Sequence, residues 1–186
     1  MKTGAAALAI LLVAPGCSDT SDFPVREIAA AIPERPDGPI LDAADVLPAA
    51  EEALLDARLR DYWKRNRTSV VVVSVDSLGG DSIEHFSRTL AEAWQIGDPQ
   101  THRGLLVLVA PNERQVRIEV NCKLETVISD EFAGRVIREH MLPQYKLGAL
   151  SDGTVSGVNA LLERLDAGAT LPPAADPCGA ETKQAA

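Results

Sequence analysis

Acidic side chains stand at the ends of several predicted strands, where they could bind a divalent cation together. The group, which includes one histidine, consists of Asp42, Asp98, His102, Glu125 and Asp130. In an α/β sheet the loops at strand ends can meet in one crevice, and hard divalent cations need several oxygen ligands. Spacing alone therefore allows a metal site. Asp and Glu in loops are more often solvated or cap a helix, and the pair Ser129-Asp130 is a natural helix cap.

Standard catalytic signatures are missing from the sequence. It contains no G-x-S-x-G, H-E-x-x-H, G-x-G-x-x-G or phosphate-loop motif. The adjacent pairs Glu84-His85 and Glu139-His140 point to different faces of a helix and form no site by themselves. No residue is therefore assigned as catalytic.

Strand and helix patterns that could position the acidic group alternate along the middle of the chain. Strands are predicted at 39–41, 69–75, 105–109 and 116–120. Helices are predicted at 48–66, 81–96, 130–141 and around 155–165. Asp81 and Glu84 have capping-box spacing at the second helix. The second and third strands are continuous apolar runs, typical of strands buried on both faces, whereas the fourth alternates. This order predicts an α/β domain with helices on both faces of a mixed sheet.

The N-terminus has the pattern of a bacterial export signal. Lys2 precedes an apolar run from Ala5 to Ala14, which is about half of the roughly 20 residues that cross a bilayer as a helix. The run leads into Pro15-Gly16-Cys17, an ending that resembles a lipobox. We predict a signal peptide at 1–16 and lipidation of Cys17, which would anchor the protein on the extracytoplasmic, periplasmic side of a bacterial membrane. The alternatives are a plain signal peptide with an incidental Cys17, or a short buried helix.

Composition divides the rest of the chain and limits its partners. We predict a flexible tether over 17–38, a folded domain over 39–166 and a Pro/Ala-rich tail over 167–186. The 18 Lys and Arg against 27 Asp and Glu give a net charge of -9, which argues against nucleic-acid binding. Three cysteines are too few for a disulfide scaffold, and they lack the spacing of a zinc finger.

Ordered short motifs across the predicted domain resemble the TPM domain. They are Asp42 to Leu47, Val71 to Val75, Ser77 to Glu84, Trp94 to Asp98, Gly104 to Ala110, Arg117-Ile118, Leu124-Glu125, Ser129-Asp130, Pro143 and Lys146 to Gly148. Each motif is short, but together they follow one order over about residues 39–166. The family is named for a thylakoid acid phosphatase, a photosystem II repair factor and a receptor auxiliary protein. The resemblance implies a three-layer α/β/α sandwich around a small mixed sheet, on the non-cytoplasmic side of a membrane.

The same resemblance implies a divalent-cation site, with calcium as the expected ion. Carried over by position, its ligands are Asp42, His102, Glu125 and Asp130. The sequence departs from the family at two places. His102-Arg103-Gly104 replaces Asp-Asn-Gly, and Asn121-Cys122-Lys123 replaces Gly-x-Gly. The first change removes a carboxylate and adds a cation, which weakens a hard-cation site. The second removes two conformationally permissive glycines.

Three functions are compatible with these observations. We expect an accessory, assembly or repair factor for a membrane protein complex, held in place by its lipid anchor at Cys17. The alternatives are a metal-dependent phosphatase, as in some family members, and a structural lipoprotein that binds no ion. In an exported protein the two remaining thiols would meet an oxidising environment, so we predict a disulfide between Cys122 and Cys178.

Overall fold

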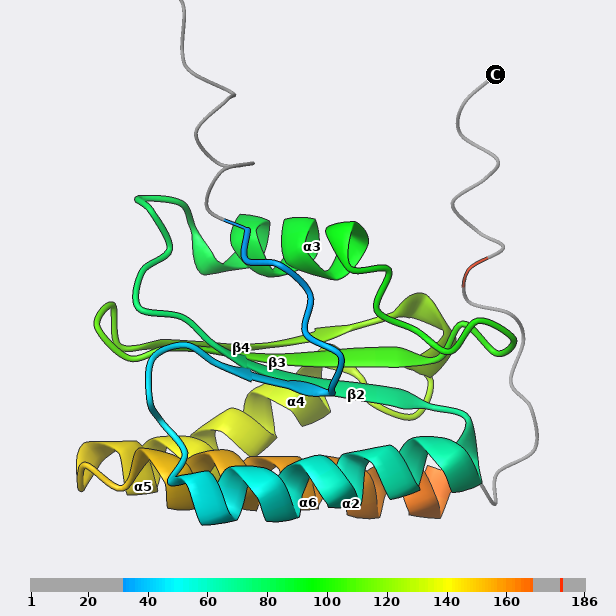
Figure 1. The fold of residues 1–186 in the computed structure, drawn as a ribbon. Coiled ribbons are helices and arrows are strands. Elements are labelled where there is room, and N and C mark those ends of the chain that lie inside the picture. The colour runs from blue at the N-terminus through cyan, green and yellow to red at the C-terminus, as the bar shows by residue number, and fades with distance from the viewer. Residues whose placement is uncertain (1–31, 169–177, 179–186) are drawn as a thin grey trace, which may run out of the picture.

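A four-stranded mixed sheet forms the middle layer of the molecule (Figure 1). The computed structural model describes residues 32–168 and Cys178. The strands lie side by side in chain order and are β1 Ile40–Asp42, β2 Ser69–Ser74, β3 Gly104–Ala110 and β4 Gln115–Val120. The first three are parallel, and β4 runs antiparallel to β3 after a short turn. The predicted signal peptide and Cys17 lie outside the described residues.

Helices cover both faces of this sheet, which confirms the predicted three-layer α/β/α architecture. Figure 1 shows α3 on one face and the other helices on the opposite face. The helices are α2 Ala49–Asn66, α3 Ile83–Ala93, α4 Asp130–Val136, α5 Leu142–Lys146 and α6 Leu150–Gly168, with short turns η1 Cys122–Leu124 and η2 Ile137–Met141. Within residues 32–168, none of them has the length and apolar content needed to span a membrane.

Two apolar clusters, one on each side of the sheet, hold the layers together. Alternate residues of β2 and β3 point to opposite sides, so that Val71 and Leu106 pack towards α3, whereas Val72 and Val107 pack towards α2 and α6. Every residue of β3 is buried. The continuous apolar runs in the sequence are therefore explained by burial of both faces, as predicted.

Two predicted helix details differ from the structure. The cap of α3 is Ser82, whose Oγ accepts a hydrogen bond from the His85 N–H, rather than Asp81. Asp81 instead accepts a hydrogen bond from the Ser82 N–H. The helix predicted over 130–141 is divided, because a π turn follows α4 and leads into α5, where Pro143 has no N–H to donate.

The segment before β1 lies against α3. Trp94 Nε1 donates a hydrogen bond to the Pro33 carbonyl over 2.9 Å, and Arg35 donates one to the Trp94 carbonyl. Ile32 adds to the apolar cluster under α3. These contacts involve the last residues of the predicted tether, and the earlier part of that segment lies outside the described residues.

The two ends of the sheet carry different loops. We call the end where β1, β2 and β3 finish the carboxyl edge, and the end where β2 and β3 begin the amino edge. Because β4 is antiparallel to β3, it finishes at the amino edge, where the Asn121 N–H donates to the Gly104 carbonyl over 3.0 Å. Loops from the α3–β3 and β4–α4 connections therefore meet there.

Candidate functional site

A groove of about 1420 Å³ opens at the amino edge of the sheet. Its walls come from the 35–39 segment, from α2, from the C-terminal half of α3, from the loop over 95–103 and from the end of β4 with the turn after it. We call it the amino-edge groove. Cations and anions both line it, namely Arg35, Arg60, Arg88, Asp37, Glu92, Glu119 and Glu125. It therefore has no single charge preference.

Asp98 organises the loop beside this groove. Its side chain is fully buried, and its Oδ1 accepts hydrogen bonds from the N–H groups of Gln100 and Thr101 over 3.0 and 2.9 Å. Its Oδ2 accepts one from the Trp63 indole over 2.9 Å and forms an ion pair with Arg67 over 3.0 Å. Gln100 and Thr101 lie on the same loop as Asp98, whereas Trp63 and Arg67 lie at the end of α2. The carboxylate therefore joins the loop to α2.

The surroundings of Asp98 keep it ionised. Burial by itself acts to raise the pKa of the carboxyl group, but the donors from Thr101, Gln100, Trp63 and Arg67 together outweigh it, so the pKa lies below its ordinary value. At neutral pH Asp98 is a charged acceptor with its oxygens occupied. This makes it a positioning group for the loop and a poor general acid.

Close backbone contact shapes the rest of the loop. His102 has a positive φ of 56°, and its N–H donates to the Asp98 carbonyl over 2.8 Å. A Cβ at Gly104 would lie 2.8 Å from Gly97 Cα and closer still to the Ile96 carbonyl oxygen. Only glycine fits at that position without displacement of the backbone, which explains the one residue of the Asp-Asn-Gly motif that the chain retains.

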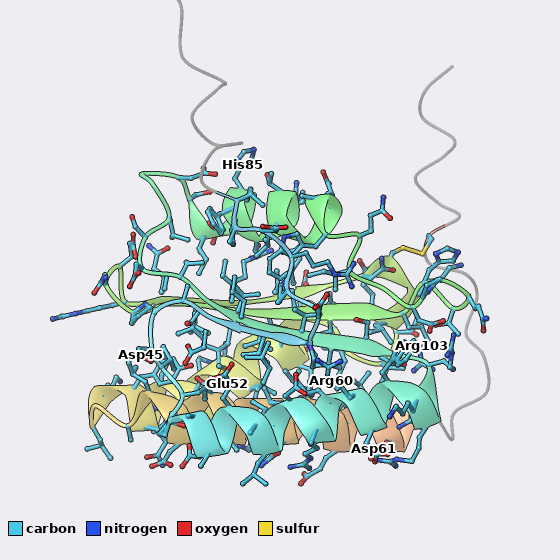
Figure 2. The ribbon with its side chains drawn as sticks, in the orientation of Figure 1. Asp45, Glu52, Arg60, Asp61, His85 and Arg103 are labelled. Atoms are coloured by element: carbon cyan, nitrogen blue, oxygen red, sulfur yellow. A yellow bond between two sulfur atoms is a disulfide. The ribbon has the colours of Figure 1, made fainter. Side chains whose placement is uncertain are left out.

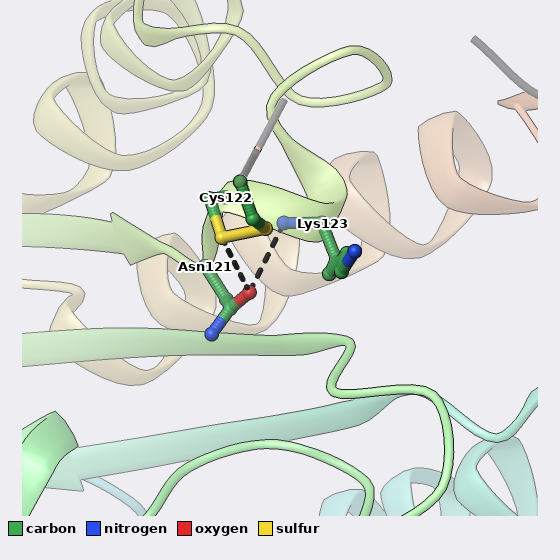
Figure 3. Close-up of a disulfide and its surroundings, with 4 residues drawn as sticks. Asn121, Cys122 and Lys123 are labelled. Carbon is green, nitrogen blue, oxygen red and sulfur yellow. Dashed lines mark hydrogen bonds between the residues drawn. A yellow bond between two sulfur atoms is a disulfide. The ribbon is translucent and has the colours of Figure 1, made fainter. Parts of the chain in front are cut away.

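Cys122, on the turn that follows β4, forms a disulfide with Cys178 (Figure 3). The predicted pairing is therefore confirmed, with a Cα–Cα distance of 5.4 Å. Asn121 caps the turn η1, because its Oδ1 accepts a hydrogen bond from the Lys123 N–H over 3.0 Å. Asn121 and Cys122 also line the amino-edge groove, so the disulfide holds Cys178 beside it.

The structure brings two of the four predicted metal ligands to one groove. His102 and Glu125 both line the amino-edge groove and are exposed. The side chain of Glu125 has no hydrogen-bond partner among the residues that the structure describes. Asp130 is the first residue of α4, is exposed and does not line the groove. It follows Ser129, which caps α4 by accepting a hydrogen bond from Phe132.

The fourth predicted ligand, Asp42, lies at the carboxyl edge. It pairs in register with Ser74, whereas Ser69 at the other end of β2 pairs with Gly104. Five residues of strand, about 16 Å at roughly 3.3 Å per residue, therefore separate the two edges. Figure 2 shows the same separation through Asp45, which follows β1, and Arg103, which precedes β3.

The side chain of Asp42 is also occupied. Its oxygens accept hydrogen bonds from the N–H groups of Val46 and Leu47 over 3.0 and 2.8 Å, and from the Ser74 hydroxyl. Over residues 32–168 no group of three or more His, Cys, Asp and Glu side chains lies close enough together to hold a metal ion. Because calcium takes six to eight oxygen ligands, this donor set does not fit a calcium site made of all four predicted residues.

Two residues of the amino edge have roles that the sequence did not indicate. Trp63 looked like one more helix residue, but its indole reaches Asp98, 35 positions along the chain. Ser87 on α3 is fully buried and donates a hydrogen bond to Glu119 over 3.1 Å. No local pattern marks either residue, since each depends on a partner that is distant in sequence.

The fold is that of a small three-layer α/β/α domain in which one helix covers one face of the sheet. Solved structures have a similar fold. The solution structure of the N-terminal domain of a protein from P. gingivalis has 28% identity and a TM-score of 0.65, with 76% of this chain and 87% of that chain covered. The BA42 protein of the psychrophilic bacterium Bizionia argentinensis has 21% identity and a TM-score of 0.56, with 70% and 88% covered.

The family follows from the sequence match. The TPM domain profile matches residues 40–164, which is most of the chain. The chain therefore belongs to the TPM domain family. A comparison with curated proteins finds no match.

Proposed function

We propose that this protein is a lipid-anchored extracytoplasmic module that binds a membrane protein complex through the amino-edge groove and acts in its assembly or repair. The size of the groove carries the proposal. Pockets for small molecules occupy about 300–1,000 Å³ and are mostly apolar, whereas this groove measures about 1420 Å³ and carries charges of both signs. Those properties favour a segment of another protein as the ligand.

The disulfide supports the proposed location. Disulfides persist in oxidising compartments and are rare in the cytosol, and Cys122 and Cys178 are paired here. An exported protein also agrees with the predicted signal peptide and with Cys17 as the lipid attachment site. The anchor itself lies outside the described residues and stays a proposal.

Photo-crosslinking in intact cells tests the binding surface. A photoreactive side chain placed at Gln95 or at His102, which both line the groove, is expected to capture the same membrane protein. The matched control is Lys146, an exposed residue on α5, in the helical layer that lies across the sheet from α3. Capture from Lys146 as efficient as from the two groove positions, or no capture at all, would contradict the proposal.

One feature favours the phosphatase alternative. Arg35, Arg60 and Arg88 line the same groove as His102 and Glu125, and arginine binds phosphate oxygens well. An activity of this kind predicts hydrolysis of an aryl phosphate by the purified protein with magnesium, manganese or calcium. It also predicts that Glu125→Ala abolishes the hydrolysis, whereas Asp42→Ala, at the other edge, acts only through stability.

A further inference from the structure

The free side of β4 is an open lateral edge of the sheet, which is distinct from the amino and carboxyl edges where the strands begin and end. β4 is the last strand of the sheet, and no strand within residues 32–168 pairs with its free side. It is also the longer of the two edge strands, because β1 has only three residues. Exposed edges of this kind pair readily with another strand. We propose that β4 pairs antiparallel with β4 of a second copy of this chain, so that two sheets join into one of eight strands.

The hydrogen-bonding pattern identifies which residues of β4 would pair. In an antiparallel ladder, hydrogen-bonded and non-hydrogen-bonded pairs alternate. Gly104 and Asn121 form a hydrogen-bonded pair, so Val120, which stands opposite Leu105, belongs to a non-hydrogen-bonded pair. The N–H and C=O groups of Val120, and by the same alternation of Ile118 and Val116, therefore point away from β3.

Charge complementarity selects the second copy as the partner and sets the register. If Ile118 stands opposite Ile118 of the other copy, then Arg117 stands opposite Glu119 and Glu119 opposite Arg117. Both charged pairs are attractive. A shift of two residues in one direction would set Arg117 opposite Arg117 of the second copy, and a shift in the other direction would set Glu119 opposite Glu119. Like charges directly opposite each other are destabilising. The strand is thus self-complementary in one antiparallel register.

The two charged side chains are held ready for this contact. Arg117 Nε donates to Glu119 Oε2 over 2.8 Å and to Ser87 Oγ over 3.1 Å, so both side chains are fixed on the α3 side of the sheet. The Nη atoms of Arg117 and Oε1 of Glu119 form no hydrogen bond within the part of the chain that the structure describes. These are the atoms that a charge-assisted bond across the dimer requires.

The opposite face of β4 adds an apolar contact. Ile118 is buried in the cluster that faces α6, and Val116 and Val120 are half-buried against it. In the proposed register Val116 stands opposite Val120 of the second copy. The apolar layer would therefore continue across the junction.

Sedimentation equilibrium on the full chain carrying Cys17→Ser, which removes the predicted lipid attachment, tests this inference. A single chain has a mass of 19.8 kDa, and the chain with an unchanged β4 is expected to sediment at twice that mass. Arg117→Glu and Glu119→Arg should each weaken the dimer roughly tenfold or more, because each sets like charges opposite each other at two symmetric positions. The double variant Arg117→Glu/Glu119→Arg should dimerise like the parent.

A mixture of the two single variants provides the sharpest test, because each would complement the other and form a mixed dimer. A variant that fails to fold would not be rescued in this way. Lys146→Glu makes the same change in charge as Arg117→Glu on a distant helix and should leave the dimer unchanged. A parent chain that sediments at the single-chain mass, or a dimer that tolerates every one of these substitutions, would overturn the inference.

Discussion

The Trp63 indole donates a hydrogen bond to the buried carboxylate of Asp98 over 2.9 Å, and this contact joins α2 to the loop that forms one wall of the amino-edge groove. The loop keeps its shape through that carboxylate, because the N–H groups of Gln100 and Thr101 bond to its other oxygen. Asp98 therefore links this wall of the groove to α2.

Asp98→Asn is expected to lower the thermal midpoint at neutral pH, because the amide loses the charge that Arg67 neutralises and can accept fewer hydrogen bonds. The folded state holds the pKa of Asp98 below its ordinary value. Its stabilising effect is therefore complete above the unfolded pKa of about 3.9 and is lost as the pH falls through the lower, folded value. Calorimetry should show a gap between the parent and variant midpoints at pH 7 that narrows below about pH 4.

Asp61→Asn serves as the matched control for that measurement. Asp61 forms an exposed i,i+4 pair with Arg65, and such surface pairs contribute little to stability. Its midpoint should stay close to that of the parent at every pH. An Asp98→Asn midpoint that matches the parent at pH 7 would show that the carboxylate does not hold the loop.

Gly104→Ala should destabilise the domain by about 1–3 kcal/mol, the usual cost of overpacking a tight site. The added methyl group would meet the backbone of Ile96 and Gly97, which cannot move aside as a side chain could. Gly134→Ala is the control, because its nearest neighbour is the flexible end of Arg138 and alanine favours a helix. Urea denaturation of both variants measures the difference, and equal free energies of unfolding would rule out the close contact.

Several of these features follow from the sequence and others do not. The strands β2 and β3 were predictable because burial on both faces leaves an unbroken apolar run. The burial of Asp98 was not, since a lone Asp in a loop is usually solvated and its partner Trp63 is 35 positions away. The cap of α3 was misplaced by one residue because Asp81 and Ser82 are both suitable caps.

The predicted metal ligands illustrate a second reason. Asp42 is the last residue of β1 and His102 precedes β3, and these strands run in the same direction, so the two residues lie at opposite ends of the sheet. Glu125 follows β4, whose reversed direction returns it to the end that His102 occupies. Strand order and direction are tertiary properties, and the motif spacing does not contain them.

Removal of the disulfide is expected to cost about 4 kcal/mol of stability in the chain-entropy model, because it closes a loop of 56 residues. Cys122→Ser and Cys178→Ser should lose the same amount, and reduction of the parent should reproduce it. Urea denaturation with and without a reductant measures the effect. Free-thiol labelling of both cysteines in the untreated, exported protein would contradict the pairing.

Calcium should have little effect on the folded protein, because His102 and Glu125 are the two predicted ligands that share the groove. An ion bound only by the native state would raise the thermal midpoint. We expect no rise at millimolar calcium, in the parent or in Glu125→Ala. A rise in the parent that Glu125→Ala removes would restore the predicted cation site and favour the phosphatase alternative.

Lipid attachment is expected to depend on Cys17 alone. Cells supplied with a labelled fatty acid should transfer the label to the parent chain, and Cys17→Ser should abolish the transfer and release the protein from the membrane fraction. Cys178→Ser is the control and should be labelled normally. Labelling that survives Cys17→Ser would contradict the predicted anchor.

The most direct test of the proposed accessory function is the abundance of membrane complexes in cells that lack this protein. Quantitative proteomics of membranes should show the loss of one complex on deletion and its return with the wild-type gene or Lys146→Glu. A groove variant, Arg88→Glu/Glu92→Arg, keeps the net charge but reverses two lining residues, and we expect it to fail. Unchanged membrane complexes after deletion, or full restoration by the groove variant, would contradict the account.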